Sequence, residues 1–100
     1  MKQIERITYM ESILDEATEV ISKLENNLDD YLLLLPKLNE LIEYYDGEWR
    51  HDYEDDELGK LPRDLKRGVV SEDAVYNLLV DHREVINSMR RILELYKEKD

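Results

Sequence analysis

Residues 7–45, ITYMESILDEATEVISKLENNLDDYLLLLPKLNELIEYY, decide the fold of this chain. Their apolar side chains recur at alternating intervals of three and four residues, which is the heptad spacing of packed helices. This long apolar stripe consists of Ile7, Met10, Leu14, Ala17, Ile21, Leu24, Leu28, Tyr31, Leu35, Leu38, Ile42 and Tyr45. The stripe is wider on one side, as in a bundle helix, because apolar residues also stand at Ile13, Val20, Leu34 and Leu41. The spacing predicts one amphipathic helix over about residues 3–46.

Pro36 lies inside this pattern. Its nitrogen has no hydrogen for the Leu32 carbonyl, and a proline inside a helix costs about 3 kcal/mol. The apolar spacing nevertheless continues unchanged, and Leu35 is a poor residue for starting a new helix. We therefore expect a kink near Pro36 rather than a break. The helix should end at Asp46-Gly47, with Gly47 in the left-handed conformation.

A second apolar stripe lies near the C-terminus and predicts a helix over about residues 72–98. Ser71 is the expected N-cap, with Val70 and Val75 as a hydrophobic staple. The stripe consists of Val75, Leu78, His82, Val85, Met89, Ile92 and Tyr96, widened by Leu79, Ile86 and Leu93. Two such stripes predict a single all-α domain, residues 1–100, of two long helices packed antiparallel.

Residues 47–70 connect the two helices. Trp49 and Tyr53 are four residues apart, so they can share one face of a short acidic helix, and Pro62 can begin a further turn that ends at Gly68. The two long helices differ in length, with roughly 44 residues in the first and 27 in the second. Part of the long apolar stripe therefore lacks a partner, unless the connector or a second copy of the chain covers it.

Composition excludes several classes of function. The chain has no cysteine, which excludes disulfides and thiolate metal sites and fits a cytoplasmic protein. We expect no secretory signal in the first residues and no membrane span, because the longest apolar run is only residues 32–35. The formal net charge of −11 repels nucleic acids and anionic membranes, so neither is an expected partner.

Acidic residues raise the question of a metal site. A calcium-binding loop that began at Asp52 would need glycine and glutamate where Glu57 and Arg63 stand. His51 and Asp55 have helical spacing, but two ligands do not make a site. We therefore expect no metal, no cofactor and no catalytic residue, with weak cation binding by residues 52–57 left open.

A metal-dependent enzyme acting on a nucleotide or another phosphorylated small molecule is one alternative function. The paired carboxylates that suggest it are Glu40, Glu43, Asp81 and Glu84. Such an enzyme holds its metal between helices, so these acids would have to face inward. The phase of the apolar stripes points them outward, which disfavours this alternative.

The connector also carries a basic island, Lys60, Arg63, Lys66 and Arg67. It suggests a second alternative, weak binding of nucleic acid through residues 60–67. The same cations can instead pair with the acids at 54–57 and dock the connector. The connector also contains Trp49 and Tyr53. Exposed aromatic residues concentrate at interfaces, but these two can instead pack on the protein's own long helix. The candidate interaction surface comprises Trp49, Tyr53, Leu58, Lys60, Arg63, Lys66 and Arg67.

The leading hypothesis is a non-enzymatic module for protein–protein interaction or self-association. It rests on the surplus length of the long apolar stripe and on the absence of a catalytic pattern. The partner is a second copy of the chain, with a dimer favoured, or another protein. The candidate self-association seam is Ile21, Leu24, Leu28 and Tyr31.

Residues 59–76, GKLPRDLKRGVVSEDAVY, carry a family resemblance, supported by the Tyr31, Leu35-Pro36 and Glu48-Trp49-Arg50 steps. With these motifs the chain resembles the small bacterial proteins grouped as domain of unknown function 4298. The resemblance implies a helical bacterial protein without an assigned activity. It supplies no catalytic residues.

Overall fold

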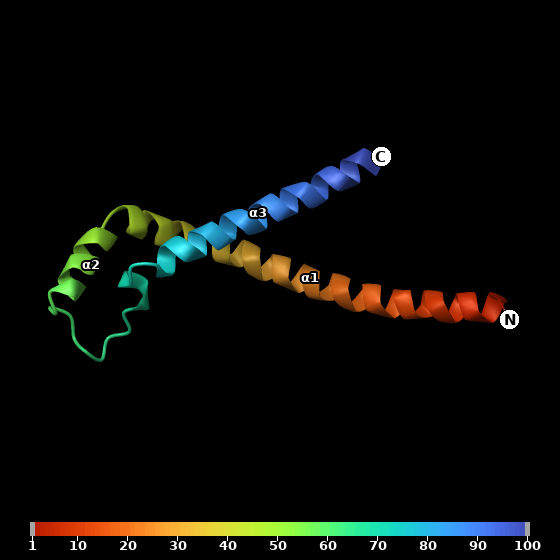
Figure 1. The fold of residues 1–100 in the computed structure, drawn as a ribbon, viewed down its shortest axis with the longest axis horizontal. Coiled ribbons are helices and arrows are strands. Elements are labelled where there is room, and N and C mark those ends of the chain that lie inside the picture. Colours follow the sequence, from red (N-terminus) through yellow and green to blue (C-terminus); the bar gives the residue numbers. More distant parts are fainter. Residues whose placement is uncertain (1, 100) are drawn as a thin grey trace. The chain divides into compact units, whose positions relative to one another are not determined.

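The computed structural model describes residues 2–99, and side chains over residues 2–97. Its elements are helix α1 (Lys2–Asp46), helix α2 (Trp49–Glu57), the 3-10 turn η1 (Gly68–Val70) and helix α3 (Ala74–Lys99) (Figure 1). No strand occurs among residues 2–99, so the all-α prediction is confirmed. The chain divides after Leu41 into two compact units, which are described separately.

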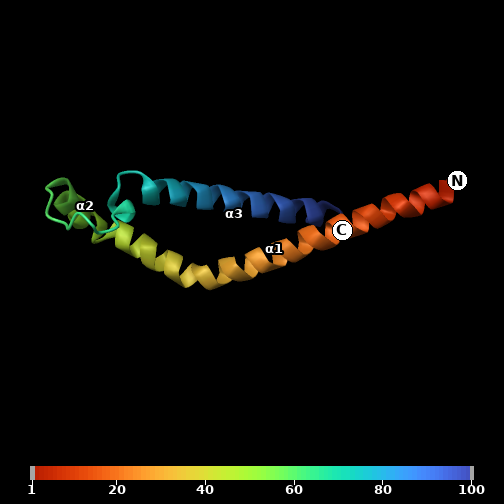
Figure 2. The ribbon, with the colours of Figure 1, turned by 90° about the horizontal axis from the view of Figure 1, so that it is seen from below.

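The first unit is a single stretch of α1. The helix passes through Pro36 without interruption, as the continuous apolar spacing predicts (Figure 2). Because this unit contains no second element, its apolar side chains have nothing within the unit to pack against. Stripe residues up to Leu28 accordingly remain exposed, with exposed fractions of 53% for Ile7, 58% for Leu14 and 53% for Ile21, whereas Leu38 near the end of the unit is buried, at 6%.

The second unit begins with the last turn of α1 and contains α2, η1 and α3. The prediction that Gly47 is left-handed is wrong. Glu48 has helical backbone angles, φ −69° and ψ −17°, so the chain passes almost directly from α1 into α2. Among the described residues only Gly59 has a positive φ, at 71°.

Gly59 ends α2 in a Schellman motif. The Gly59 amide donates to the Asp56 carbonyl, and the Lys60 amide donates to the Asp55 carbonyl, both at 3.0 Å. These two bonds satisfy carbonyls that the helix end would otherwise leave unpaired. The left-handed glycine is therefore used at the end of the short acidic helix rather than at the end of the long one.

The start of α3 also differs from the prediction. Ser71 is not the N-cap, because α3 begins three residues after it and its hydroxyl donates to the Gly68 carbonyl at 2.7 Å. The helix starts at Ala74, two residues later than expected. Val70 and Val75, the expected staple, are both buried, each only 4% exposed.

The connector between α2 and η1 contains the turn predicted at Pro62. The Leu65 amide donates to the Pro62 carbonyl at 3.2 Å, so this turn closes at Leu65 and not at Gly68. Gly68 instead begins η1, which packs against both α2 and α3. The 3-10 turn is thus the element that ties the connector to its two neighbouring helices.

Replacing Gly59 with alanine tests the role of its conformation. Because a side chain in the left-handed region is strained by about 1 kcal/mol, Gly59→Ala should lower the free energy of unfolding by that amount. Urea unfolding followed by the fluorescence of Trp49, the sole tryptophan, reports on this unit. Gly68→Ala is the control, since its added Cβ meets open space and its φ is ordinary. Equal losses in the two variants would contradict the assignment.

Candidate functional site

Trp49 is the centre of an aromatic stack in the second unit. Its ring centroid lies 5.0 Å from that of Tyr45, at an interplanar angle of 60°, and 5.0 Å from that of Tyr53, nearly parallel at 17°. Its indole Nε1 donates to the Val69 carbonyl at 2.8 Å. One half-buried side chain therefore joins the last turn of α1, helix α2 and η1.

A second link between α1 and α2 is polar. The Tyr44 hydroxyl donates to the Asp52 carboxylate at 2.7 Å. Burial raises the pKa of Tyr44 to about 12, and the hydrogen bond and negative charge of Asp52 act in the same direction. On α2 itself, the Glu57 carboxylate raises the pKa of Tyr53. Tyr44 thus remains a neutral hydrogen-bond donor throughout the physiological range.

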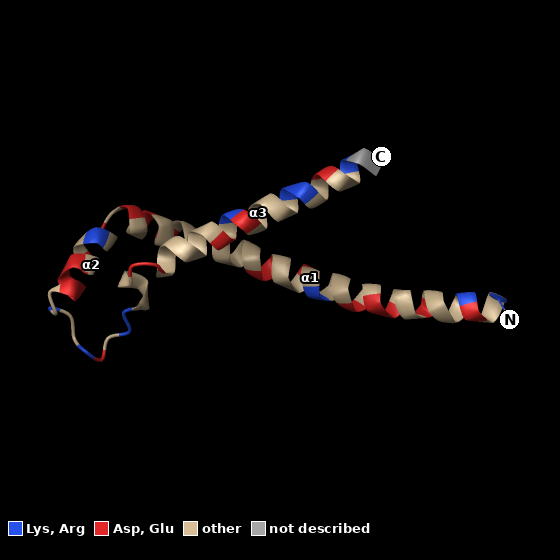
Figure 3. Cartoon of the chain, viewed as in Figure 1, with Lys and Arg blue, Asp and Glu red and all other residues tan. Residues whose placement is uncertain are grey.

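The basic island and the acidic α2 face each other in part (Figure 3). Arg67 pairs with Asp56 at 2.8 Å, with both side chains partly buried. Lys60 lies 3.9 Å from Asp55, a carboxylate that also lies 3.4 Å from His51 Nε2. These contacts dock the connector, although the exposed pairs contribute less than about 1 kcal/mol each.

The candidate interaction surface separates into two groups. Trp49, Tyr53 and Arg67 are partly buried and make contacts within the chain, as described above. The others are exposed to solvent, although Lys60 also lies near Asp55; they are Leu58, Lys60, Arg63 and Lys66. Arg63 and Lys66 form no ion pair within the described part of the chain. The solvent-facing part is therefore a short basic segment with one apolar residue.

Sequence reasoning missed two members of this cluster. Tyr45 precedes Trp49 by four residues, the spacing already noted between Trp49 and Tyr53, so the same signal would have found it. The acceptor of the indole is a backbone carbonyl twenty positions away, at Val69. No pattern of side chains marks such a partner.

The carboxylates of the alternative enzyme hypothesis are all exposed: Glu40, Glu43, Asp81 and Glu84. Over the residues that the structure describes, no three histidine, aspartate or glutamate side chains are placed to hold a metal ion. His82 is half-buried and makes contacts of its own.

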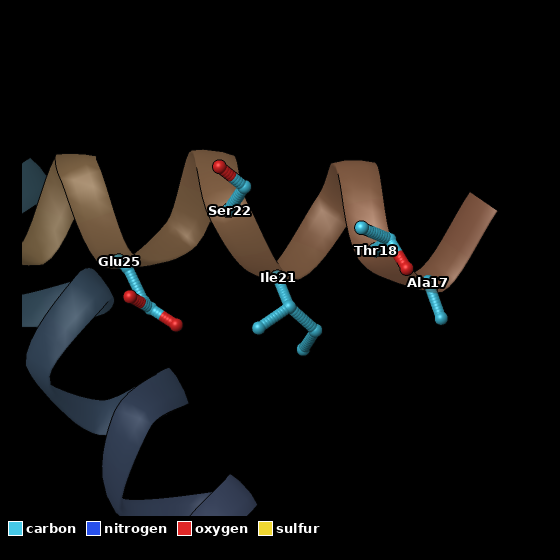
Figure 4. A pocket seen from close by; sticks show the side chains of 5 residues that line it. All are labelled: Ala17, Thr18, Ile21, Ser22 and Glu25. Atoms are coloured by element: carbon cyan, nitrogen blue, oxygen red, sulfur yellow. The ribbon is translucent and has the colours of Figure 1, made fainter. Parts of the chain in front are cut away.

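The self-association seam lies on the first unit. Ile21, Leu24 and Leu28 are 53%, 50% and 40% exposed, whereas Tyr31 is half-buried. Beside Ile21 runs a shallow groove of about 440 Å³, lined by Ala17, Thr18, Ile21, Ser22 and Glu25. In Figure 4, Ala17 and Ile21 point to the same side of the helix. The small side chain of Ala17 leaves a notch in an otherwise bulky apolar row.

The indole hydrogen bond is testable with Trp49→Phe, which keeps a ring in the stack but removes the donor. Loss of about 1 kcal/mol should speed amide hydrogen exchange at Val70 and Ser71 roughly fivefold. Tyr53→Phe, which removes only a hydroxyl, is the matched control and should change these rates less than twofold. Unchanged exchange in Trp49→Phe would contradict a stabilising role for the bond.

The Tyr44–Asp52 bond should give a pH-dependent stability. Because the folded pKa is raised above the ordinary value of 10.0, its contribution is complete below pH 10 and is lost as the pH rises towards 12. Tyr44→Phe should therefore be less stable than the parent by about 1 kcal/mol at pH 8. Urea unfolding should find this gap shrinking between pH 10 and 12. A constant gap would rule out the linkage.

No helix in the described part of the chain combines the length and the apolar character that crossing a membrane requires. Comparison with curated proteins and with solved structures found no match to this chain. The family described as Domain of unknown function (DUF4298) matches residues 7–92, which confirms the resemblance carried by residues 59–76. The chain belongs to the DUF4298 family.

Proposed function

We propose that this protein is a non-enzymatic helical interaction module that self-associates, as a dimer, through the long apolar stripe of α1. The supporting observation is the exposure of that stripe between Ile7 and Leu28. Every Ile, Leu, Met and Val side chain in this interval is at least 40% exposed. Contiguous apolar surface of this kind is typical of protein–protein contact sites.

The lengths of the helices support an additional partner. In our proposal α3 packs antiparallel on the part of α1 that follows Leu28, with α1 kinked near Pro36 to follow it. α1 has 45 residues and α3 has 26, so α3 is too short to cover the whole of α1. The stripe from Ile7 to Leu28 is then available to a second copy, and it is about 33 Å long at 1.5 Å per residue.

The stripe from Ile7 to Leu28 is long enough for a stable contact. Ile7 to Leu28 spans three heptads, the minimum over which a coiled coil is normally recognised. A helix pair of this length extends its apolar contact over several successive turns. The stripe can therefore support a dimer without any contribution from the connector.

The remaining parts of the proposal concern chemistry and location. A non-enzymatic role is supported by the exposed, dispersed carboxylates of the described residues. A cytoplasmic location is supported by the lack of cysteine, which suits a reducing compartment. The family match covers most of the chain and carries no assigned activity.

Leu24→Asp tests self-association, because a charge in the stripe cannot be buried against a second copy without a partner. Multi-angle light scattering at tens of micromolar should give twice the 12.0 kDa chain mass for the parent and the chain mass for Leu24→Asp. Leu28→Asp should behave likewise. Leu33→Asp is the matched control: Leu33 lies off the stripe, is 77% exposed, and should leave the mass unchanged. A parent protein that elutes as a 12.0 kDa monomer would overturn the proposal.

A further inference from the structure

We propose that the two copies pack with their α1 helices antiparallel, in a register that sets Leu14 of each copy against Ala17 of the other. This inference rests on the proposed function, since it specifies how the copies meet. The occupant of the stripe is then the same stripe of a second chain, reversed in direction. Shape, flanking residues and charge each favour this arrangement.

Shape complementarity favours registers that set a bulky residue against Ala17. In antiparallel helices, the first core position of each heptad faces the second core position of the partner. Setting Leu14 against Ala17 also sets Met10 against Ile21, and Ile7 against Leu24. The layers formed by Ile7, Met10, Leu14, Ala17, Ile21 and Leu24 are then apolar, Leu28 meets Gln3 at the end of the contact, and the notch beside Ala17 receives a bulky leucine. Large against small residues in facing positions is how well-packed helical layers interdigitate.

The residues that flank the stripe distinguish the two directions. Ile13 and Val20 widen the stripe on one side of α1 and are 42% and 54% exposed. In an antiparallel pair this side faces the same side of the partner, so Ile13 meets Val20. In a parallel pair it faces the opposite flank, which would set Val20 against Glu25 and Ile13 against Thr18. Only the antiparallel direction covers both apolar side chains with apolar partners.

Charge acts in the same direction. Residues 1–14 contain two basic and two acidic side chains, and residues 17–30 contain one basic and four acidic ones, a net charge of −3. A parallel pair would place the two acidic segments beside each other. The antiparallel register places each acidic segment beside the neutral segment of the other copy. Like charges across an interface are unfavourable, so this direction avoids a repulsion.

Disulfide trapping provides the test, because the chain has no cysteine of its own. The variants are Met10→Cys and Ile21→Cys. In the proposed register these two positions face each other, whereas residue 10 of one copy lies about 16 Å from residue 10 of the other at the helical rise. A disulfide requires Cα atoms within about 7 Å. Mild oxidation of an equimolar mixture should therefore give the mixed dimer, and each variant alone should stay unlinked.

Three results decide between the arrangements. Efficient cross-linking of either variant alone indicates a parallel pair and overturns the antiparallel register. The register is also overturned if the parent is a dimer but the mixture gives no cross-link, and if a second mixture, of Ile13→Cys with Val20→Cys, gives none either. Light scattering of the parent distinguishes a wrong register from a wrong proposed function. A dimeric parent without cross-links contradicts only the register, whereas a monomeric parent contradicts both the register and self-association. Far-UV circular dichroism of each variant checks that the helices are intact.

Discussion

A single helix cannot bury its own apolar side, and this constraint governs the first unit of the protein. The apolar stripe of α1 follows the helix from Ile7 to Tyr45, whereas the unit that ends at Leu41 contains no other element. Isolated helices gain little stability from propensity alone, and most of their stability in proteins comes from packing of the apolar face. The helical state of the first unit is therefore tied to whatever covers the stripe.

The second unit is organised differently, around contacts that lie within it. The Trp49 ring and its indole hydrogen bond join α1, α2 and η1, and the Arg67–Asp56 pair fastens the connector to α2. Val70 and Val75 are buried where η1 meets α3. These contacts use most of the aromatic and charged residues that appear functional in the sequence. The side chains that remain exposed include the apolar stripe of α1 up to Leu28 and the basic residues Arg63 and Lys66 of the connector.

Sequence periodicity predicted the long helices because a heptad stripe has no other structural solution, and the spacing of Trp49 and Tyr53 predicted their shared face. It failed at chain reversals. Gly47 and Gly59 both follow acidic helical segments, so both carry the same sequence signal for a left-handed helix end. In the structure Glu48 continues the helical path after Gly47, and only Gly59 among the described residues has a positive φ. Ser71 is a good N-cap by residue type, but in the structure its hydroxyl donates to the Gly68 carbonyl. Local signals of this kind are decided by tertiary geometry.

The same limit applies to the candidate surface. Residue type alone did not separate Arg67, which pairs with Asp56, from Arg63, which is exposed.

The central claim is that a second copy of the chain covers the apolar stripe of α1, and hydrogen exchange measured at several protein concentrations tests it most directly. If a second copy covers the stripe, protection of amides at residues 7–28 rises with concentration while protection at residues 68–71 stays constant. Protection at residues 7–28 that is independent of concentration would contradict the account.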